Sequence, residues 1–249
     1  MQPEQSIEET GATDTVYFLY RYRPFRDEFD SLQRMLSENL WWFGPRTGFD
    51  DELDCVLGGT RLTPEGIERT VRESGGTDLD VRKALNDSSL LARIPRSVQK
   101  KSIDTIGILC FSELMDHPRL WREYADSGHG ACLCLVTEKL LLASDERSNY
   151  KPHAVRYFDA PPHIWNPEAE DGLAEVSSVL LRKNKKWEYQ REWRIMRSGV
   201  GHHPMPTDSL RAVILGSRLS EAKRRRIARW VNSGPWNPMP TIITSRCPR

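Results

Sequence analysis

The alternation of apolar and polar residues predicts β-strands throughout the chain. Residues 16–23, VYFLYRYR, alternate with a period of two and end at Pro24, which has no N–H group to continue a strand pairing. Residues 106–111 are apolar on both faces, as in a central strand, and end in Ser112; residues 131–136 form the next strand. Residues 210–215 and 241–244 have the same strand character. We expect 16–23, 106–112 and 131–136 to lie in one central sheet, together with a strand over 187–196.

The stretch from Lys183 to Arg197, KNKKWEYQREWRIMR, has the most distinctive alternation. It predicts a strand over 187–196 whose aromatic and β-branched residues face a core. The opposite face carries an amide and a carboxylate two residues apart, Gln190 and Glu192. Taken alone, such a face is more typical of a solvated strand with cross-strand salt bridges, so a functional interpretation needs support from other segments.

Between these strands, apolar residues recur at helical spacing. It predicts helices over 27–39 and 173–180, a short helix over 119–126, and a C-terminal helix capped by Ser220. Residues 58–102 predict a helical insertion, with one helix starting at Thr63-Pro64 and another over 79–93. Strands and helices mix without a regular βαβ rhythm, which favours an α+β fold. We therefore expect a disordered lead over 1–14 and a single α+β domain over 15–249. That domain should have a mixed, mostly antiparallel central sheet with flanking helices.

Composition narrows the class of protein. The 249 residues include 36 basic and 35 acidic side chains, so overall charge indicates neither nucleic-acid binding nor membrane binding. The polar N-terminal segment is unlike a signal peptide, and no apolar run reaches the length of a membrane helix. The 5 cysteines have no CxxC spacing, which favours reduced thiols. We expect a cytoplasmic protein that makes no membrane contact.

Three patches occur in a characteristic order: YRYRPF with GFDDELD, then ILCFSELMDHPRLWREYADSGHGACLCL, then KNKKWEYQREWRIM. Together they resemble a bacterial family known only as a domain of unknown function, across residues 17–215. Members of that family show YKYR, FNDPFD, CFS and W.YE.E.R in the same order. The FDDELD loop departs from the family pattern in lacking its asparagine and proline. The resemblance implies a gene that is often located near phage-defence genes. It implies no particular reaction, because none is established for the family.

The same patches look like a diverged ADP-ribosyltransferase. Enzymes of that class commonly use an arginine on the first strand, a serine ending a central strand, and a Gln/Glu-x-Glu motif on a later strand. Arg21 or Arg23, then Ser112, then Gln190-x-Glu192 occur here in that order. The class usually carries a Ser-Thr-Ser signature, which this chain lacks after its serine.

This resemblance implies NAD as the substrate. Glu192 would stabilise the positive charge that develops on the ribose as the nicotinamide–ribose bond breaks, with Gln190 and Ser112 beside it. An aromatic ring, Tyr22 or Tyr124 among the candidates, would stack on nicotinamide. No metal ion is expected. The acceptor of ADP-ribose, whether protein, nucleic acid, small molecule or water, and the oligomeric state are not predicted. Such an enzyme would serve as a toxin or a phage-defence effector.

The two arginines differ in their expected roles. On a regular strand, Arg21 and Arg23 point to the same face, about 7 Å apart. Arg23 precedes Pro24 at the strand end, and the resembling family has lysine or arginine at the Arg21 position. Lysine attracts a phosphate but cannot donate two parallel hydrogen bonds to it. We therefore predict that Arg23 binds phosphate and that Arg21 is a supporting charge. In the alternative, Arg23 pairs with the acidic loop 50–54.

Two other functional hypotheses are open. A metal-dependent nuclease would use the acidic loop 50–54, with Glu113 and Glu192, as oxygen ligands for magnesium or manganese. Adjacent Asp50 and Asp51 cannot both face one site on regular backbone, which counts against this hypothesis. A non-enzymatic module that recognises a ligand or a phage protein in an aromatic-lined cleft is also compatible with the sequence.

Overall fold

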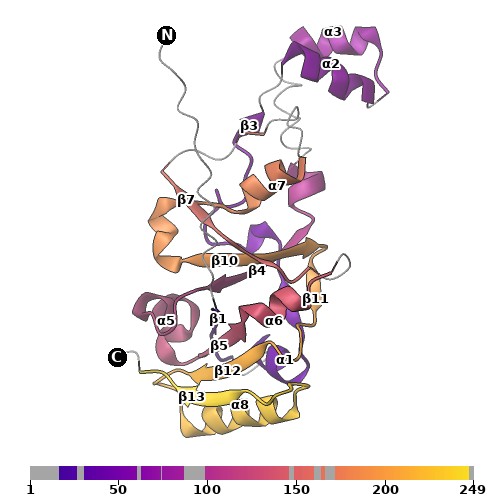
Figure 1. Ribbon diagram of the computed structural model, residues 1–249. Helices are drawn as coiled ribbons and strands as arrows, with labels where there is room; N and C mark the ends of the chain where they lie inside the picture. Colours follow the sequence, from indigo (N-terminus) through magenta and orange to yellow (C-terminus); the bar gives the residue numbers. More distant parts are fainter. Residues whose placement is uncertain are drawn as a thin grey trace.

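A seven-stranded sheet forms the centre of the part of the chain described by the computed structural model. The described residues are 17–26, 31–60, 63–73, 75–86, 99–145, 149–159, 164–165 and 172–246. In spatial order the strands are β13 (Thr241–Thr244), β12 (Leu210–Leu215), β5 (Ala131–Val136), β1 (Phe18–Arg23), β4 (Ile106–Ser112), β10 (Glu192–Ser198) and β6 (Pro152–Ala154) (Figure 1). Neighbouring strands are antiparallel except β12 and β13, which are parallel. The predicted α+β fold with a mixed, mostly antiparallel sheet is confirmed.

Helices cover both faces of this sheet. On one face, α1 (Ser31–Ser37) and α8 (Glu221–Ser233) share a core cluster with Leu19 of β1. On the other, α5 (Pro118–Tyr124) packs Trp121 against Tyr22 of the same strand. Leu19 and Tyr22 differ in parity, so their side chains leave opposite faces of β1. α7 (Gly172–Leu180) packs Val179 near Ile108 of β4, and α6 (Thr137–Leu142) follows β5 directly.

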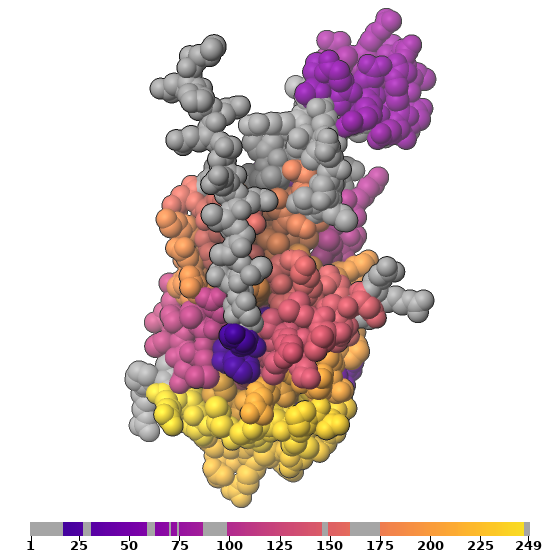
Figure 2. Space-filling model, viewed as in Figure 1, coloured from indigo at the N-terminus to yellow at the C-terminus, as the bar shows by residue number. Residues whose placement is uncertain are grey.

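Three two-stranded pairings lie outside the central sheet. β2 (Trp41–Phe43) pairs with β11 (Gly201–His203), β3 (Gly59–Thr60) with β8 (Ile164–Trp165), and β7 (Arg156–Phe158) with β9 (Arg182–Asn184). The helices α2 (Pro64–Glu73) and α3 (Asp78–Asn86) lie beyond β3, away from the sheet (Figures 1 and 2). A π-helical turn, Gln99–Ile103, leads from this region into β4. Residues 87–93 of the second predicted helix lie outside the described residues.

The predicted strand over 187–196 is wrong in its first part. Lys185–Gln190 form a 3₁₀ helix, Arg191 has a left-handed backbone with φ 44°, and β10 begins at Glu192. The Asn184 side chain caps the helix by accepting a hydrogen bond from the Lys186 N–H. Long-range contacts decide this conformation, because the Trp187 indole donates to Asp51, which is distant in sequence. Local alternation therefore misassigned these residues.

Residues 152–158 contain two short strands, β6 and β7, because the chain changes partners at Val155. Its N–H donates to the carbonyl of Glu192, and the next N–H, of Arg156, donates to Leu181. The helix expected over 27–39 is α1 over its described part, and 27–30 lie outside the described residues.

The structure also bears on the predictions about cysteines and membrane helices, for the residues that it describes. Cys55, Cys110, Cys132 and Cys134 are free thiols, and Cys247 lies outside the described part of the chain. Among the helices described, none is both long and apolar enough to cross a membrane.

Gly130 provides a test of how closely β5 approaches the end of β1. A Cβ atom at this position would lie 2.1 Å from the Arg23 carbonyl oxygen and 2.9 Å from the Cα of Pro24. We predict that Gly130→Ala lowers the free energy of unfolding by about 2 kcal/mol, because backbone must move to admit the methyl group. Urea denaturation measures this change. Gly48→Ala is the control, because its Cβ would meet nothing within 4 Å. Equal stability of both variants would contradict the close approach.

Candidate functional site

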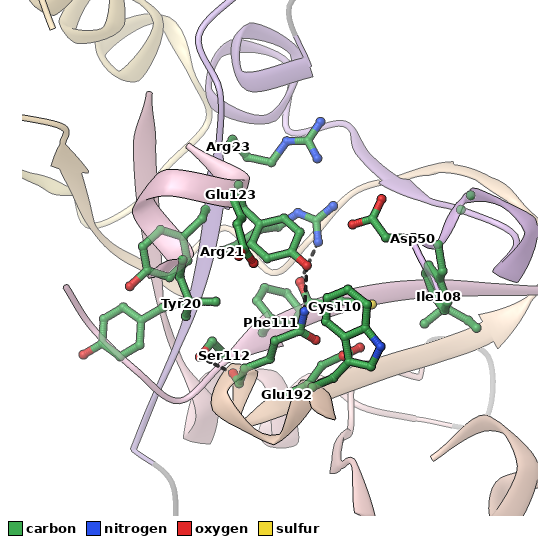
Figure 3. Close-up of a pocket in the computed structure, with 18 of the residues that line it drawn as sticks. Tyr20, Arg21, Arg23, Asp50, Ile108, Cys110, Phe111, Ser112, Glu123 and Glu192 are labelled. Carbon is green, nitrogen blue, oxygen red and sulfur yellow. Dashed lines mark hydrogen bonds between the residues drawn. The ribbon is translucent and has the colours of Figure 1, made fainter. Parts of the chain in front are cut away.

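A cleft of about 550 Å³ opens beside the end of β1. This volume is within the range typical of small-molecule sites. Residues from β1, the loop after β2, β4, α5 and the segment 183–192 line it (Figure 3). All of the residues predicted for the site are among them: Arg21, Tyr22, Arg23, Ser112, Tyr124, Gln190 and Glu192. The structure thus brings together side chains from three distant segments, while their individual roles stay predictions.

A local separation of two strands creates the floor of the cleft. β1 pairs with β4 at Tyr20 and Ser112. Further along the same edge of β4, the Arg21 guanidinium donates at 2.5 Å to the carbonyl of Cys110, in place of a backbone group. Still further, Ile108 exchanges two backbone hydrogen bonds with Gly44, which follows β2. The chain after β2 thus replaces β1 as the neighbour of β4. Arg21 and Arg23 line the space between β1 and this chain segment.

Glu192 is held in a buried ion network. One carboxylate oxygen accepts from the Lys183 ammonium at 2.6 Å and the other from Arg194 Nε at 2.7 Å. Arg194 is 0% exposed and also bonds Asp54 at 2.7 Å, while Lys183 lies 3.3 Å from the same aspartate. Two cations and two anions therefore balance one another between β10, the segment before it, and the acidic loop.

Electrostatics keeps this network charged. Burial alone would raise the pKa of Glu192, but the adjacent Arg194 and Lys183 outweigh burial and lower it from 4.5 to about 2. Burial alone would lower the pKa of Lys183, but Glu192 and Asp54 raise it above its ordinary value. At neutral pH the cleft therefore has a permanently ionised carboxylate in its wall.

Gln190 connects this carboxylate to the aromatic side of the cleft. Its amide oxygen accepts from Lys183 at 2.8 Å, and its amide nitrogen donates to the Tyr124 hydroxyl at 2.6 Å. Gln190 and Glu192 were predicted to share a strand face, but Gln190 ends a 3₁₀ helix, Glu192 begins β10, and the left-handed Arg191 lies between them. They converge nonetheless, because Lys183 bonds both. Burial, the adjacent Tyr189 and the charge of Asp50 raise the pKa of Tyr124.

The Ser112 hydroxyl is engaged in hydrogen bonds to the backbone. Its hydroxyl donates to the Gln190 carbonyl at 2.7 Å and accepts from the Leu114 N–H at 3.0 Å. It also pairs directly with Glu192 across β4 and β10. The serine therefore positions the backbone of the Gln-x-Glu segment. This geometry favours bracing of the motif over direct contact with a ribose, the two roles compatible with a serine at this strand end.

The arginines provide the cationic end of the cleft. Burial and the neighbouring charge of Arg23 lower the pKa of Arg21 to about 9, so Arg21 remains a cation at neutral pH. Its Nε atom is buried and has no hydrogen-bond partner among the described residues. Arg23 donates from Nη2 to the Ser31 hydroxyl at 2.5 Å.

Tyr22 lies beneath the cleft and offers little surface to a ligand. It is 7% exposed, and its hydroxyl donates to the Leu114 carbonyl at 2.8 Å. Its ring meets Trp121 edge-on, with centroids 5.2 Å apart. A core position explains this tyrosine better than stacking on a ligand does.

The acidic loop is divided among separate partners. Asp51 accepts from the Trp187 indole at 2.9 Å, and Asp54 belongs to the ion network. Glu113, the other proposed metal ligand, bonds Arg191 at 2.7 Å on an exposed surface. Within the described part of the chain, no cluster of three or more His, Cys, Asp or Glu side chains could hold a metal ion. Asp50 differs from these carboxylates, because it is exposed and lines the cleft.

Sequence analysis missed three residues of the site: Lys183, Arg194 and Trp187. Lys183 lies in a lysine-rich segment, which is typical of a solvent-exposed turn. Arg194 lies on the strand face that carries Gln190 and Glu192, which we interpreted as polar. The available signal for Arg194 was its position two residues after Glu192 in a strand with apolar neighbours. Its counter-ion Asp54 is distant in sequence, so local patterning could not identify the pair.

Comparison with known proteins was informative for part of the chain. A family model described as "Protein of unknown function (DUF2971)" matches residues 120–195, which include most of α5, all of β5, Lys183, the Gln-x-Glu segment and Arg194. This match supports the resemblance to a domain-of-unknown-function family. No curated protein and no solved structure matches the chain.

The ion network makes a prediction about stability. Glu192→Gln leaves Lys183 and Arg194 with one buried counter-charge, so we expect the free energy of unfolding at pH 7 to fall by about 3 kcal/mol. The folded pKa of about 2 lies below the unfolded value near 4.5. This contribution is therefore present above pH 4.5 and lost as the pH falls towards 2.

Chemical denaturation from pH 7 to pH 2 measures both effects. The wild-type curve should fall more steeply than that of Glu192→Gln between pH 4.5 and 2. Glu188→Gln is the matched control, since Glu188 lies in the same segment but is exposed. Parallel pH curves for wild type and Glu192→Gln would show that the network does not stabilise the fold.

Proposed function

We propose that this protein is an ADP-ribosyltransferase-like enzyme that binds NAD in the cleft and cleaves its nicotinamide–ribose bond. The observation that carries the proposal is that one cleft is lined by two arginines and by a fixed, ionised carboxylate. Arg21 and Arg23 line the same cleft as Glu192 and the Gln190 amide. A dinucleotide has the matching arrangement, an anionic diphosphate joined to a ribose that becomes cationic during cleavage.

The arginine end suits the diphosphate. Arg21 has a buried, unpartnered Nε among the described residues, and its remaining Nη1 bond holds the guanidinium in place. A phosphate oxygen would supply the missing partner and neutralise a cation whose pKa burial has lowered. Arg23 lies nearer the strand end, beside Pro24 at the rim of the same cleft.

The carboxylate end suits the reacting ribose. Lys183 and Arg194 fix Glu192 and keep it ionised, so its charge is in place before the reaction begins. Fixed groups that stabilise developing charge lower a barrier without reorganising, and one such group typically contributes about 100-fold or more in rate. We propose that Glu192 stabilises the oxocarbenium-like ribose and that Gln190 orients it through the ribose hydroxyls.

A second function is favoured by one observation. Both oxygens of Glu192 already accept charge-assisted hydrogen bonds, and the residue is 5% exposed. A carboxylate so occupied suits a module that binds a nucleotide without cleaving it. The acceptor of ADP-ribose and any role as a toxin or in phage defence belong to the proposal and await the identity of the ligand.

Nicotinamide release and NAD binding test the proposal together. Incubation of the wild-type protein with NAD should release nicotinamide, measured by chromatography, and calorimetry should show NAD binding. Binding without release would favour the sensing module. Absence of both would contradict each function.

The arginines can then be ranked by calorimetry. Arg23→Lys should weaken NAD binding about tenfold, because an ammonium cannot donate two parallel hydrogen bonds to a phosphate. Arg21→Lys should weaken it less, since Nη1 of the Arg21 guanidinium already donates to the Cys110 carbonyl. Arg211→Lys, an exposed position on β12, is the control. The reverse ranking, or equal affinities, would refute the assignment of Arg23 as the principal phosphate ligand.

A further inference from the structure

The carboxylates that line the cleft differ in whether their oxygens are already occupied. Both oxygens of Glu192 accept from Lys183 and Arg194. Asp51 is 7% exposed and accepts from Trp187. Glu123 accepts from Arg119 at 2.8 Å and from the Tyr189 hydroxyl at 2.7 Å. None of these carboxylates is available to take a proton from an incoming group without breaking contacts of its own.

Asp50 is the exception among the cleft carboxylates described. It is exposed, and its side chain has no hydrogen-bond or ion-pair partner within the described residues. Asp50 lines the cleft, and Figure 3 shows its carboxylate pointing towards the guanidinium of Arg21. Its charge contributes, after burial and Tyr189, to the raised pKa of Tyr124, which also lines the cleft.

The loop holds Asp50 in this position through its neighbours. The Trp187 indole bonds Asp51, and the Leu53 N–H bonds the other oxygen of Asp51 at 3.4 Å. On the preceding side, Phe49 packs under the Arg194 guanidinium, 5.1 Å from its ring centroid. Two fixed residues flank Asp50, so the backbone around it is anchored while its own carboxylate is left in the cleft.

We propose that Asp50 is the general base that activates the acceptor of ADP-ribose, and that this acceptor is a protonated nucleophile such as a hydroxyl group or water. The inference rests on the proposed cleavage of NAD. The acceptor O–H proton passes to an Asp50 oxygen, and the oxygen lone pair forms a bond to C1′ of the ribose. The C1′–nitrogen bond breaks, and its electron pair leaves with nicotinamide, which becomes neutral.

In this proposal two carboxylates have different roles. Glu192 stabilises the ribose cation, and Asp50 takes the proton of the acceptor. Glu192 is ionised and fixed by two cations, which suits stabilisation of a developing cation, whereas Asp50 is an exposed cleft residue whose oxygens have no protein partner among the described residues. General bases typically contribute about 100-fold to 10,000-fold in rate. In the competing explanation, Asp50 takes no proton. Its negative charge acts on the arginines and thereby changes the affinity for NAD.

The experiment uses NAD as donor and water as acceptor, with nicotinamide release measured at saturating NAD and NAD affinity measured by calorimetry. Asp50→Asn should lower the maximal rate about 100-fold or more and change the affinity less than twofold. Glu52→Gln is the matched control, because Glu52 is an exposed acid on the same loop that does not line the cleft. It should change neither quantity. In Asp50→Ala, added formate should restore part of the rate, since a small carboxylate can occupy the vacated space.

Three results would overturn the inference. Unchanged nicotinamide release by Asp50→Asn, in a protein whose wild type is active, would remove the base role and leave the proposed function standing. Loss of NAD affinity with no fall in maximal rate would show that Asp50 acts on binding. No nicotinamide release by the wild-type protein would defeat the proposed function, and this inference with it. Thermal unfolding of each variant verifies that the fold is intact.

Discussion

The buried pairing of Arg194 with Glu192 and Asp54 is the interaction on which the site depends. A guanidinium with no exposure to solvent must find anionic partners within the fold, because an uncompensated buried charge costs several kcal/mol. One partner belongs to β10 itself and the other to the loop after β2. Satisfying this one side chain therefore fixes the acidic loop against the sheet, and Lys183 completes the balance of charge.

The position of the cleft follows from that constraint together with the separation of β1 from β4. The loop held by Arg194 forms one wall, and Arg21, bonded to the edge of β4 that β1 has left, forms another. In one wall Lys183 and Arg194 neutralise Glu192, and Arg21 and Arg23 line the same cleft. The same arrangement leaves the Asp50 carboxylate and the Nε atom of Arg21 without partners among the described residues. Groups of this kind suggest a polar ligand more strongly than the paired charges around them.

Sequence patterns predicted the parts of this molecule that local chemistry determines. The strands β1, β4, β5 and β12 followed from alternation and from apolar runs, and the Ser220 cap followed from its hydroxyl. The conformation of 185–190 did not, because a distant aspartate bonds Trp187 and holds a helical turn where alternation indicates a strand. The same limit applies to the site: motif order brought Arg21, Ser112 and Glu192 to one cleft, but the buried role of Arg194 depends on a partner that no local pattern identifies.

The central claim is that this cleft holds NAD with its diphosphate at the arginines and its nicotinamide ribose beside Glu192. A crystal structure of the protein grown with saturating NAD tests it most directly. The account predicts phosphate oxygens within hydrogen-bond distance of Arg21 or Arg23, and ribose hydroxyls next to Gln190 and Glu192. NAD bound elsewhere on the surface, or a cleft that stays empty under these conditions, would contradict it.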